Sequence, residues 1–192
     1  MPNCNTPSLS RAVFLDRDGT IIEDRGHIRS VGDIELYPFA VKALKLLQEK
    51  YLLFIVTNQS GIGLGKVRLD DAIKVNDHLV SVLEMAGICI HDVYMCSHTR
   101  DDNCECIKPK PYFIQKAQND YNLDITNSFT IGDHPHDVEF GTRSGATGLY
   151  VLTGHGKKHR AGISDHDVFF ENLLEAAHWI IESRAGKTGN PK

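Results

Sequence analysis

The sequence lacks any apolar run near the roughly 20 residues that a bilayer-spanning helix needs. Residues 1–5 are mostly polar and lack the apolar core of a signal peptide. Positive charge is not in excess either, because 25 acidic residues outnumber 21 lysines and arginines and give a net charge of −4. No broad basic surface is therefore available for nucleic acid. We expect a cytoplasmic protein, a monomer, whose partner is a small molecule rather than a membrane or a nucleic acid.

Cysteine is scarce, and the five residues are an odd number. Two of them, Cys4 and Cys89, have no neighbours at metal-ligand spacing. We expect Cys4 to be an exposed thiol and Cys89 to be a core residue. The other three, Cys96, Cys104 and Cys106, lie within eleven residues that also contain His98. Three thiolates and one imidazole form a closed tetrahedral set, which is typical of structural zinc in a reducing compartment. The alternative is a group of reduced surface cysteines beside a coincidental histidine.

A length of 192 residues with 41% hydrophobic content favours one domain. We expect that domain at 11–184, between a flexible arm at 1–10 and a flexible tail at 185–192. Short apolar runs predict strands near 12–15, 52–56, 92–95, 128–131, 149–152 and 167–170. Helical spacing predicts helices from Pro38 through Leu47 and near 70–86, 113–121, 135–144 and 173–181. This alternation predicts an α/β fold, a three-layer doubly wound parallel sheet with right-handed crossovers and no large cap domain.

Polar side chains follow four of these strands. Asp16 and Asp18 come directly after the first, and Gly19 then permits a sharp turn. The second ends in Thr57, followed by a glycine-rich turn suited to anions that contains Asn58, Gln59 and Ser60. Lys108 lies beyond the third strand, and Asp133 follows the fourth. Because ligands bind outside the carboxyl ends of parallel strands, we expect these groups to converge on a phosphate site.

In this order, Asp16-Arg17-Asp18-Gly19-Thr20, Thr57-Asn58, Lys108-Pro109 and Gly132-Asp133 with Asp137 resemble the four motifs of the haloacid dehalogenase (HAD) phosphohydrolases. The resemblance covers about residues 12–152. It implies that Asp16 is the nucleophile and Asp18 the general acid and base, while Thr57 and Lys108 hold phosphate oxygens. It further implies that Mg²⁺ is held by Asp16, the backbone carbonyl of Asp18, and Asp133, with Asp137 orienting the waters of the metal. The alternative is that the paired aspartates cap a turn and Lys108 is a surface charge.

The cysteine-rich loop before Lys-Pro narrows the resemblance to the D-glycero-D-manno-heptose 1,7-bisphosphate phosphatases and the histidinol-phosphate phosphatases. The turn from Thr57 resembles the heptose enzymes, whereas the short interval from His98 to Cys104 resembles the histidinol enzymes. The sequence departs from both groups at Ile107, and from the heptose enzymes at Leu64, where arginine is usual. Arg17, Arg25, Arg29 or Lys66 could supply the missing charge. The resemblance implies loss of the 7-phosphate from the heptose bisphosphate; alternatives are histidinol phosphate or another sugar phosphate.

Three further questions stay open at this stage. The turn after Thr57 also resembles polynucleotide 3′-phosphatases, and a zinc-stapled scaffold without turnover is a third reading. His134 and His136 flank the expected metal motif and could touch substrate or cap the following helix. Residues 155–160 form a basic loop that is either solvated or attracts an anionic substrate. Without a large cap, loops near 20–37, 58–68 and 96–111 must select the substrate.

Overall fold

The computed structural model describes residues 10–163 and 168–185 of the chain. The arm expected at 1–10 and the tail expected at 185–192 lie almost entirely outside this part. Its six strands form one sheet in the order β3-β2-β1-β4-β5-β6, and every neighbouring pair is parallel. The strands are β1 (Ala12–Leu15), β2 (Leu52–Asn58), β3 (Ile90–Cys96), β4 (Phe129–Gly132), β5 (Thr147–Val151) and β6 (Val168–Phe170).

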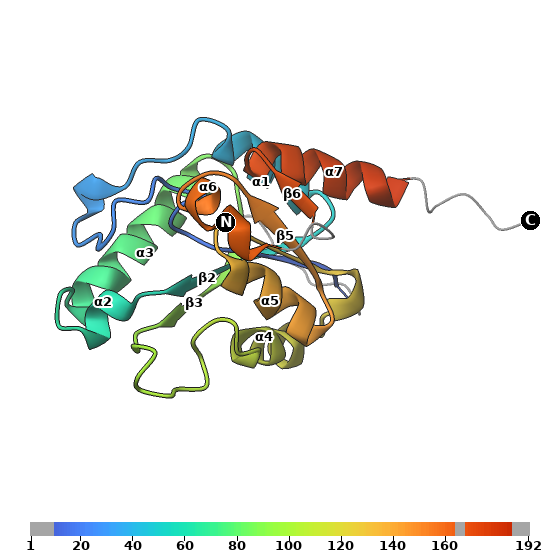
Figure 1. Cartoon of the computed structure of the whole chain (residues 1–192). Coiled ribbons are helices and arrows are strands. Elements are labelled where there is room, and N and C mark those ends of the chain that lie inside the picture. Colours follow the sequence, from blue (N-terminus) through green and yellow to red (C-terminus); the bar gives the residue numbers. More distant parts are fainter. Residues whose placement is uncertain (1–9, 164–167, 186–192) are drawn as a thin grey trace, which may run out of the picture.

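Helices cover both faces of this sheet, as expected for a doubly wound fold (Figure 1). One face carries α1 (Ala40–Gln48), α3 (Leu69–Met85) and α7 (Leu173–Ala185), and the other carries α4 (Tyr112–Tyr121) and α5 (Pro135–Ser144). Alternate residues of β1 supply the two hydrophobic cores, because side chains along a strand point to opposite faces. Val13 and Leu15 pack with the first group of helices, whereas Ala12 and Phe14 pack with the second. The parallel α/β prediction is confirmed.

The expected strands and helices all occur among the described residues, with shifted ends. The third strand extends to Ile90 and Cys96 rather than stopping at 92 and 95. Two expected loops contain short helices, α2 (Ser60–Gly63) and α6 (Gly156–His159). The first lies in the glycine-rich turn and the second in the basic loop, so the description of residues 155–160 as a plain loop is wrong. Three-residue 3₁₀ helices lie at η1 (Val31–Asp33), η2 (Ile125–Asn127) and η3 (Arg160–Gly162).

Two further observations concern membrane spans and the remaining cysteines. Among the described residues, no helix combines the length and apolarity needed to cross a membrane. Cys89, which we expect to be a core residue, is half-buried and disulfide-bonded. Cys4 lies outside the described residues.

Candidate active site

The carboxyl ends of β1, β2 and β4 open into one cavity, together with the loop that follows β3. Parallel strands bring these ends to the same edge of the sheet, which is why residues more than 100 positions apart meet here. The cavity is lined by Asp16, Asp18, Asp24, Thr57, Asn58, Ser60, Arg100, Ile107, Lys108, Asp133, His134, His136 and Asp137. Of the expected site residues at these strand ends, the structure brings all but Gln59 to the cavity wall.

Lys108 is the buried cation of this cavity. Its Nζ lies 2.5 Å from Asp16 Oδ1 and 2.6 Å from Asp137 Oδ1, and it donates a hydrogen bond of 2.8 Å to the carbonyl of Val56. The side chain of Asn58 fixes the main chain of Lys108: its Oδ1 accepts from the Lys108 N–H at 3.1 Å. Although burial opposes its charge, Asp137 and Asp16 hold the pKa of Lys108 above its ordinary value. Lys108 therefore stays charged beside Asp16.

Asp18 is held by a different set of partners. The guanidinium of Arg17 donates to both of its carboxylate oxygens, at 3.1 Å each, and Gln59 Nε2 donates to Oδ2 at 2.9 Å. The same guanidinium donates to Asn76 Oδ1 in α3 at 2.7 Å, which fixes its other side. Burial raises the pKa of Asp18, and the charge of Arg17 opposes this shift. A carboxyl group that is held in place and favours its proton is suited to act as an acid.

The turn after β2 divides into cavity residues and supporting residues. Thr57 is buried, and its Oγ1 accepts a hydrogen bond of 2.8 Å from Gln59 Nε2. Thr57, Asn58 and Ser60 line the cavity, whereas Gln59 lines a neighbouring cavity and joins Thr57 to Asp18. The amide of Gln59 therefore positions two cavity residues instead of facing the cavity itself.

Asp133 lies where two glycines make room for its carboxylate. A Cβ on Gly19 would lie 2.1 Å from Asp133 Oδ2, and one on Gly154 would lie 2.3 Å from the same oxygen. Both glycines have a positive φ, a conformation that side chains disfavour. The main-chain N–H of His155 donates to Asp133 Oδ2 at 2.7 Å. Burial, followed by the charge of Asp16, raises the pKa of Asp133 to about 8.

These carboxylates suit a hard divalent cation. Carboxylate oxygens of Asp16, Asp133 and Asp137, which we call the acidic cluster, lie within 4.8 Å of one another. Five carboxylates line the cavity against two permanent cations, Lys108 and Arg100. Burial raises the pKa of Asp16 to about 6 against the attraction of Lys108, so the protein alone does not stabilise all of this negative charge. Oxygen-rich sites with such an excess are the ones that Mg²⁺ occupies.

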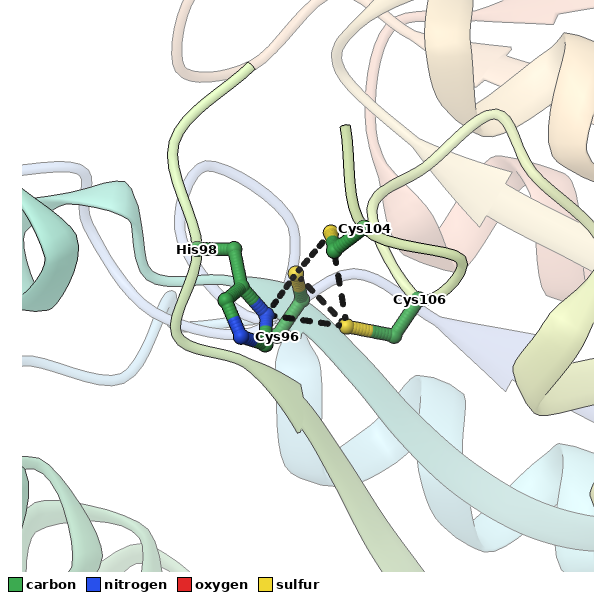
Figure 2. Close-up of side chains that lie close together, drawn as sticks. All are labelled: Cys96, His98, Cys104 and Cys106. Atoms are coloured by element: carbon green, nitrogen blue, oxygen red, sulfur yellow. Dashed lines mark hydrogen bonds between the residues drawn. The ribbon is translucent and has the colours of Figure 1, made fainter. Parts of the chain in front are cut away.

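Cys96, His98, Cys104 and Cys106, which we call the Cys/His cluster, point toward one another beside the end of β3 (Figure 2). The Sγ of Cys96 lies 3.0 Å from that of Cys106 and 3.6 Å from that of Cys104, and His98 Nδ1 lies 3.3 Å from Cys106 Sγ. The edge of a tetrahedron with Zn–S bonds near 2.3 Å is about 3.8 Å. The spacing therefore fits a single tetrahedral ion. Burial raises the pKa of the Cys96 thiol, so a thiolate there needs a cation.

The histidines after β4 serve as a helix cap and also face the cavity. His134 precedes α5, and its Nδ1 accepts from the N–H of His136 at 3.3 Å, while Asp137 Oδ2 accepts from the N–H of His134 at 3.0 Å. Both imidazoles line the cavity. Burial, followed by the charges of His136 and His159, lowers the pKa of His134 to about 4, so this ring is neutral near pH 7.

The sequence analysis did not single out Arg100, and it counted Arg17 among the cations that could replace the arginine absent at position 107. The four proposed replacement cations, Arg17, Arg25, Arg29 and Lys66, lie in the described part of the chain, and none of them lines the cavity. Arg17 is fully buried against Asp18, and Arg25 pairs with Glu35. No periodic pattern marks Arg100, because it lies in an irregular loop. Asp24, in the loop after β1, also lines the cavity.

Comparisons with known proteins agree with this arrangement. A family described as HAD-hydrolase-like matches residues 105–176. The D-glycero-alpha-D-manno-heptose-1,7-bisphosphate 7-phosphatase of Campylobacter jejuni is 34% identical over 90% of this chain and 97% of its own length. The chain belongs to the HAD-like phosphatases. The corresponding Helicobacter pylori protein, named for the beta anomer, is 33% identical over 90% of this chain and 98% of its own length.

A solved structure gives the same result for the fold of this HAD-like phosphatase. The D,D-heptose 1,7-bisphosphate phosphatase from B. bronchiseptica, complexed with magnesium and phosphate, superimposes with a TM-score of 0.82 at 26% identity. The match covers 90% of this chain and 99% of that one. The expected resemblance to the heptose branch of the HAD phosphatases is thus confirmed, and the chain is a phosphomonoesterase by family.

Proposed function

We propose that this chain removes the 7-phosphate of D-glycero-D-manno-heptose 1,7-bisphosphate with the help of Mg²⁺. The observation that carries the proposal is the placement of Asp16 on the cavity wall, beside Lys108 and within reach of Asp133. The names of relatives that match nearly their whole length support the heptose substrate. The magnesium and phosphate in the B. bronchiseptica structure support the metal.

In the first step, a carboxylate oxygen of Asp16 attacks the phosphorus atom, and the bond from phosphorus to the sugar oxygen breaks. Asp18 gives its proton to the departing alkoxide, which leaves as the sugar alcohol, while Asp16 carries the phosphoryl group. Lys108 and the hydroxyl of Thr57 hold the phosphate oxygens. Asn58 holds Lys108 in place, and Gln59 holds Thr57. Ser60 lines the cavity, where it contacts the substrate. Arg17 and Gln59 keep the carboxyl group of Asp18 in position for the transfer.

In the second step, Asp18 takes a proton from water, and the resulting hydroxide attacks the phosphorus of the aspartyl-phosphate. Inorganic phosphate leaves, Asp16 returns to its carboxylate form, and Asp18 holds the proton again. Asp16, the backbone carbonyl of Asp18, and Asp133 would hold Mg²⁺, whose charge offsets that of the phosphoryl group. Asp137 would orient the waters of the metal, and its bond to Lys108 ties that lysine to the same cluster.

We also propose that the Cys/His cluster holds structural Zn²⁺. The near-tetrahedral spacing supports this, and four protein ligands leave no open position for substrate. Cys96, Cys104 and Cys106 are free thiols, so each can lose its proton and ligate zinc. We propose a monomer, and size-exclusion chromatography of the zinc-loaded protein tests this.

The proposed substrate is tested by phosphate release with Mg²⁺ from a panel of phosphate esters. The panel contains both anomers of heptose 1,7-bisphosphate, because the relatives are named for different anomers. It also contains histidinol phosphate, other sugar phosphates and a 3′-phosphorylated oligonucleotide. We expect kcat/KM for one heptose bisphosphate to exceed the others by about 10-fold or more. A preference for histidinol phosphate or the oligonucleotide would overturn the substrate, and no Mg²⁺-dependent release would indicate a scaffold without turnover.

A further inference from the structure

The cavity contains a second cation that the reaction itself does not use. Arg100 lies in the loop between β3 and α4 and lines the same cavity as Asp16 and Lys108. It is exposed, and among the described residues its guanidinium has no hydrogen-bond or ion-pair partner. This contrasts with Arg17, which is bound to Asp18 and Asn76, and with Arg143, which pairs with Glu139. Arg100 is therefore free to bind an anion in the cavity.

The loop around Arg100 holds its main chain in place. The Thr99 N–H and hydroxyl donate to Asp102 Oδ2 at 2.7 and 2.8 Å, so the chain turns tightly at Arg100. His98 precedes this turn and Cys104 follows it, and both belong to the Cys/His cluster. The turn also packs against α2, because a Cβ on Gly63 would lie 2.9 Å from Thr99 Cγ2. Arg100 is thus presented to the cavity by a fixed segment.

The surroundings of Arg100 suit a phosphate that is not the one being cleaved. Lys108 lies at the reacting end, beside Asp16 and Asp137, where it serves the phosphate that is cleaved. Ile107, which also lines the cavity, offers no charge. The charge of Arg100 is second only to burial in lowering the pKa of His136, which places the guanidinium near the histidines on the cavity wall. A guanidinium with five N–H donors binds phosphate with two parallel hydrogen bonds.

We propose that Arg100 binds the second phosphate of a bisphosphorylated sugar while Asp16 attacks the first. This inference rests on the proposed function and assigns a specificity-determining residue to it. The cavity joins the two groups, so Arg100 supplies from another position the charge that Ile107 lacks. Arg100 forms no part of the bond-breaking step, so its contribution is to affinity and discrimination.

The experiment compares two substrates that differ only in the phosphate assigned to Arg100. Wild type, Arg100→Gln and Arg100→Lys are assayed with Mg²⁺ on heptose 1,7-bisphosphate and on heptose 7-phosphate, using the anomer that wild type prefers. We expect Arg100→Gln to lower kcat/KM for the bisphosphate by about 10- to 100-fold, mainly through KM, and to change the monophosphate by less than about twofold. Arg100→Lys should recover part of the loss, because it keeps the charge without the paired hydrogen bonds.

The matched control is Arg143→Gln, an exposed arginine that pairs with Glu139 outside the cavity and should leave both substrates unchanged. Zinc content and melting temperature are measured for each variant, so that a disturbed loop is recognised. Equal losses on both substrates, or no loss on the bisphosphate, would overturn the role of Arg100 while leaving the phosphatase assignment intact. Wild type that releases no phosphate from either sugar would instead overturn the proposed function, and the inference with it.

Discussion

The acidic cluster and the Cys/His cluster differ in what holds their members in place. Asp16 and Asp133 follow adjacent strands β1 and β4, so the sheet and both hydrophobic cores fix them. The four members of the Cys/His cluster come from a single stretch of eleven residues, of which only Cys96 is fully buried. The first cluster is thus built by the fold as a whole. The second depends on its own loop and on the zinc ion that we propose for it.

This difference suggests that the two proposed metals have different roles, one catalytic and one structural. A site fixed by the sheet keeps its geometry without a metal, which suits the Mg²⁺ that we propose there. A site within one loop orders that loop only while metal is bound, which suits permanent zinc. Lys108 connects the two, because it lies two residues after Cys106 and contacts Asp16. It has anchors of its own in Asn58 and Val56, so it does not rely on the loop alone.

The largest expected effect comes from removing the nucleophile. Asp16→Asn should lower kcat by about 10⁴-fold or more, because an amide oxygen does not form the phosphoryl-enzyme. The melting temperature and the zinc content should change little, since the substitution keeps the shape of the side chain and removes a charge whose burial outweighs its attraction to Lys108. Phosphate release and metal analysis measure these quantities. Asp120→Asn, at an exposed residue paired with Lys116, is the control. Full activity in Asp16→Asn would contradict the assignment.

Breaking the Cys/His cluster should affect catalysis less than Asp16→Asn does, and stability more. Cys104→Ala should remove zinc and lower the melting temperature by about 5–10 °C, because metal binding there contributes to folding. We expect kcat to fall only about 10-fold, since Asn58 and Val56 still hold Lys108. Metal analysis, calorimetry and kinetics test this. Glu105→Gln, an exposed neighbour that pairs with Lys110, is the matched control. Unchanged zinc and unchanged melting would refute a structural metal.

Much of this arrangement could be predicted from the sequence. The apolar runs indicate strands, and parallel strand ends share one edge of the sheet, so the meeting of Asp16, Lys108 and Asp133 follows from topology. The Cys/His cluster could also be predicted from the sequence, because its members lie close together in the chain and their spacing restricts the loop.

The direction of single side chains could not be predicted in the same way. Arg17 lies between two cavity aspartates, yet its guanidinium is buried against Asn76 of α3, a partner 59 residues away. Gln59 turns inward to Asp18 while its neighbours line the cavity. Arg100 reaches the cavity through the path of an irregular loop. Each depends on packing between elements distant in sequence, which no periodic pattern specifies.

The smallest expected effect concerns the acidic cluster and pH. Burial raises the pKa of Asp133 to about 8 and that of Asp16 to about 6, from an ordinary value of 3.8. Between about pH 4 and pH 8 the folded protein therefore binds more protons than the unfolded chain. The free energy of unfolding of the Mg²⁺-free protein should fall as pH rises through this window, and Mg²⁺, which binds the ionised carboxylates, should reverse the loss.

We accordingly expect the rise in melting temperature on adding Mg²⁺ to be larger at pH 8 than at pH 6, by about 3 °C. The measurement uses zinc-loaded protein without chelator, so that the Cys/His cluster stays intact and contributes equally with and without Mg²⁺ at each pH. Asp133→Asn should reduce the pH dependence, because its amide does not titrate, and should leave the part that comes from Asp16, whose pKa burial raises. An equal effect of Mg²⁺ at both pH values would mean that the carboxylates are already ionised without the metal, and that the sheet, rather than the ion, stabilises their charge.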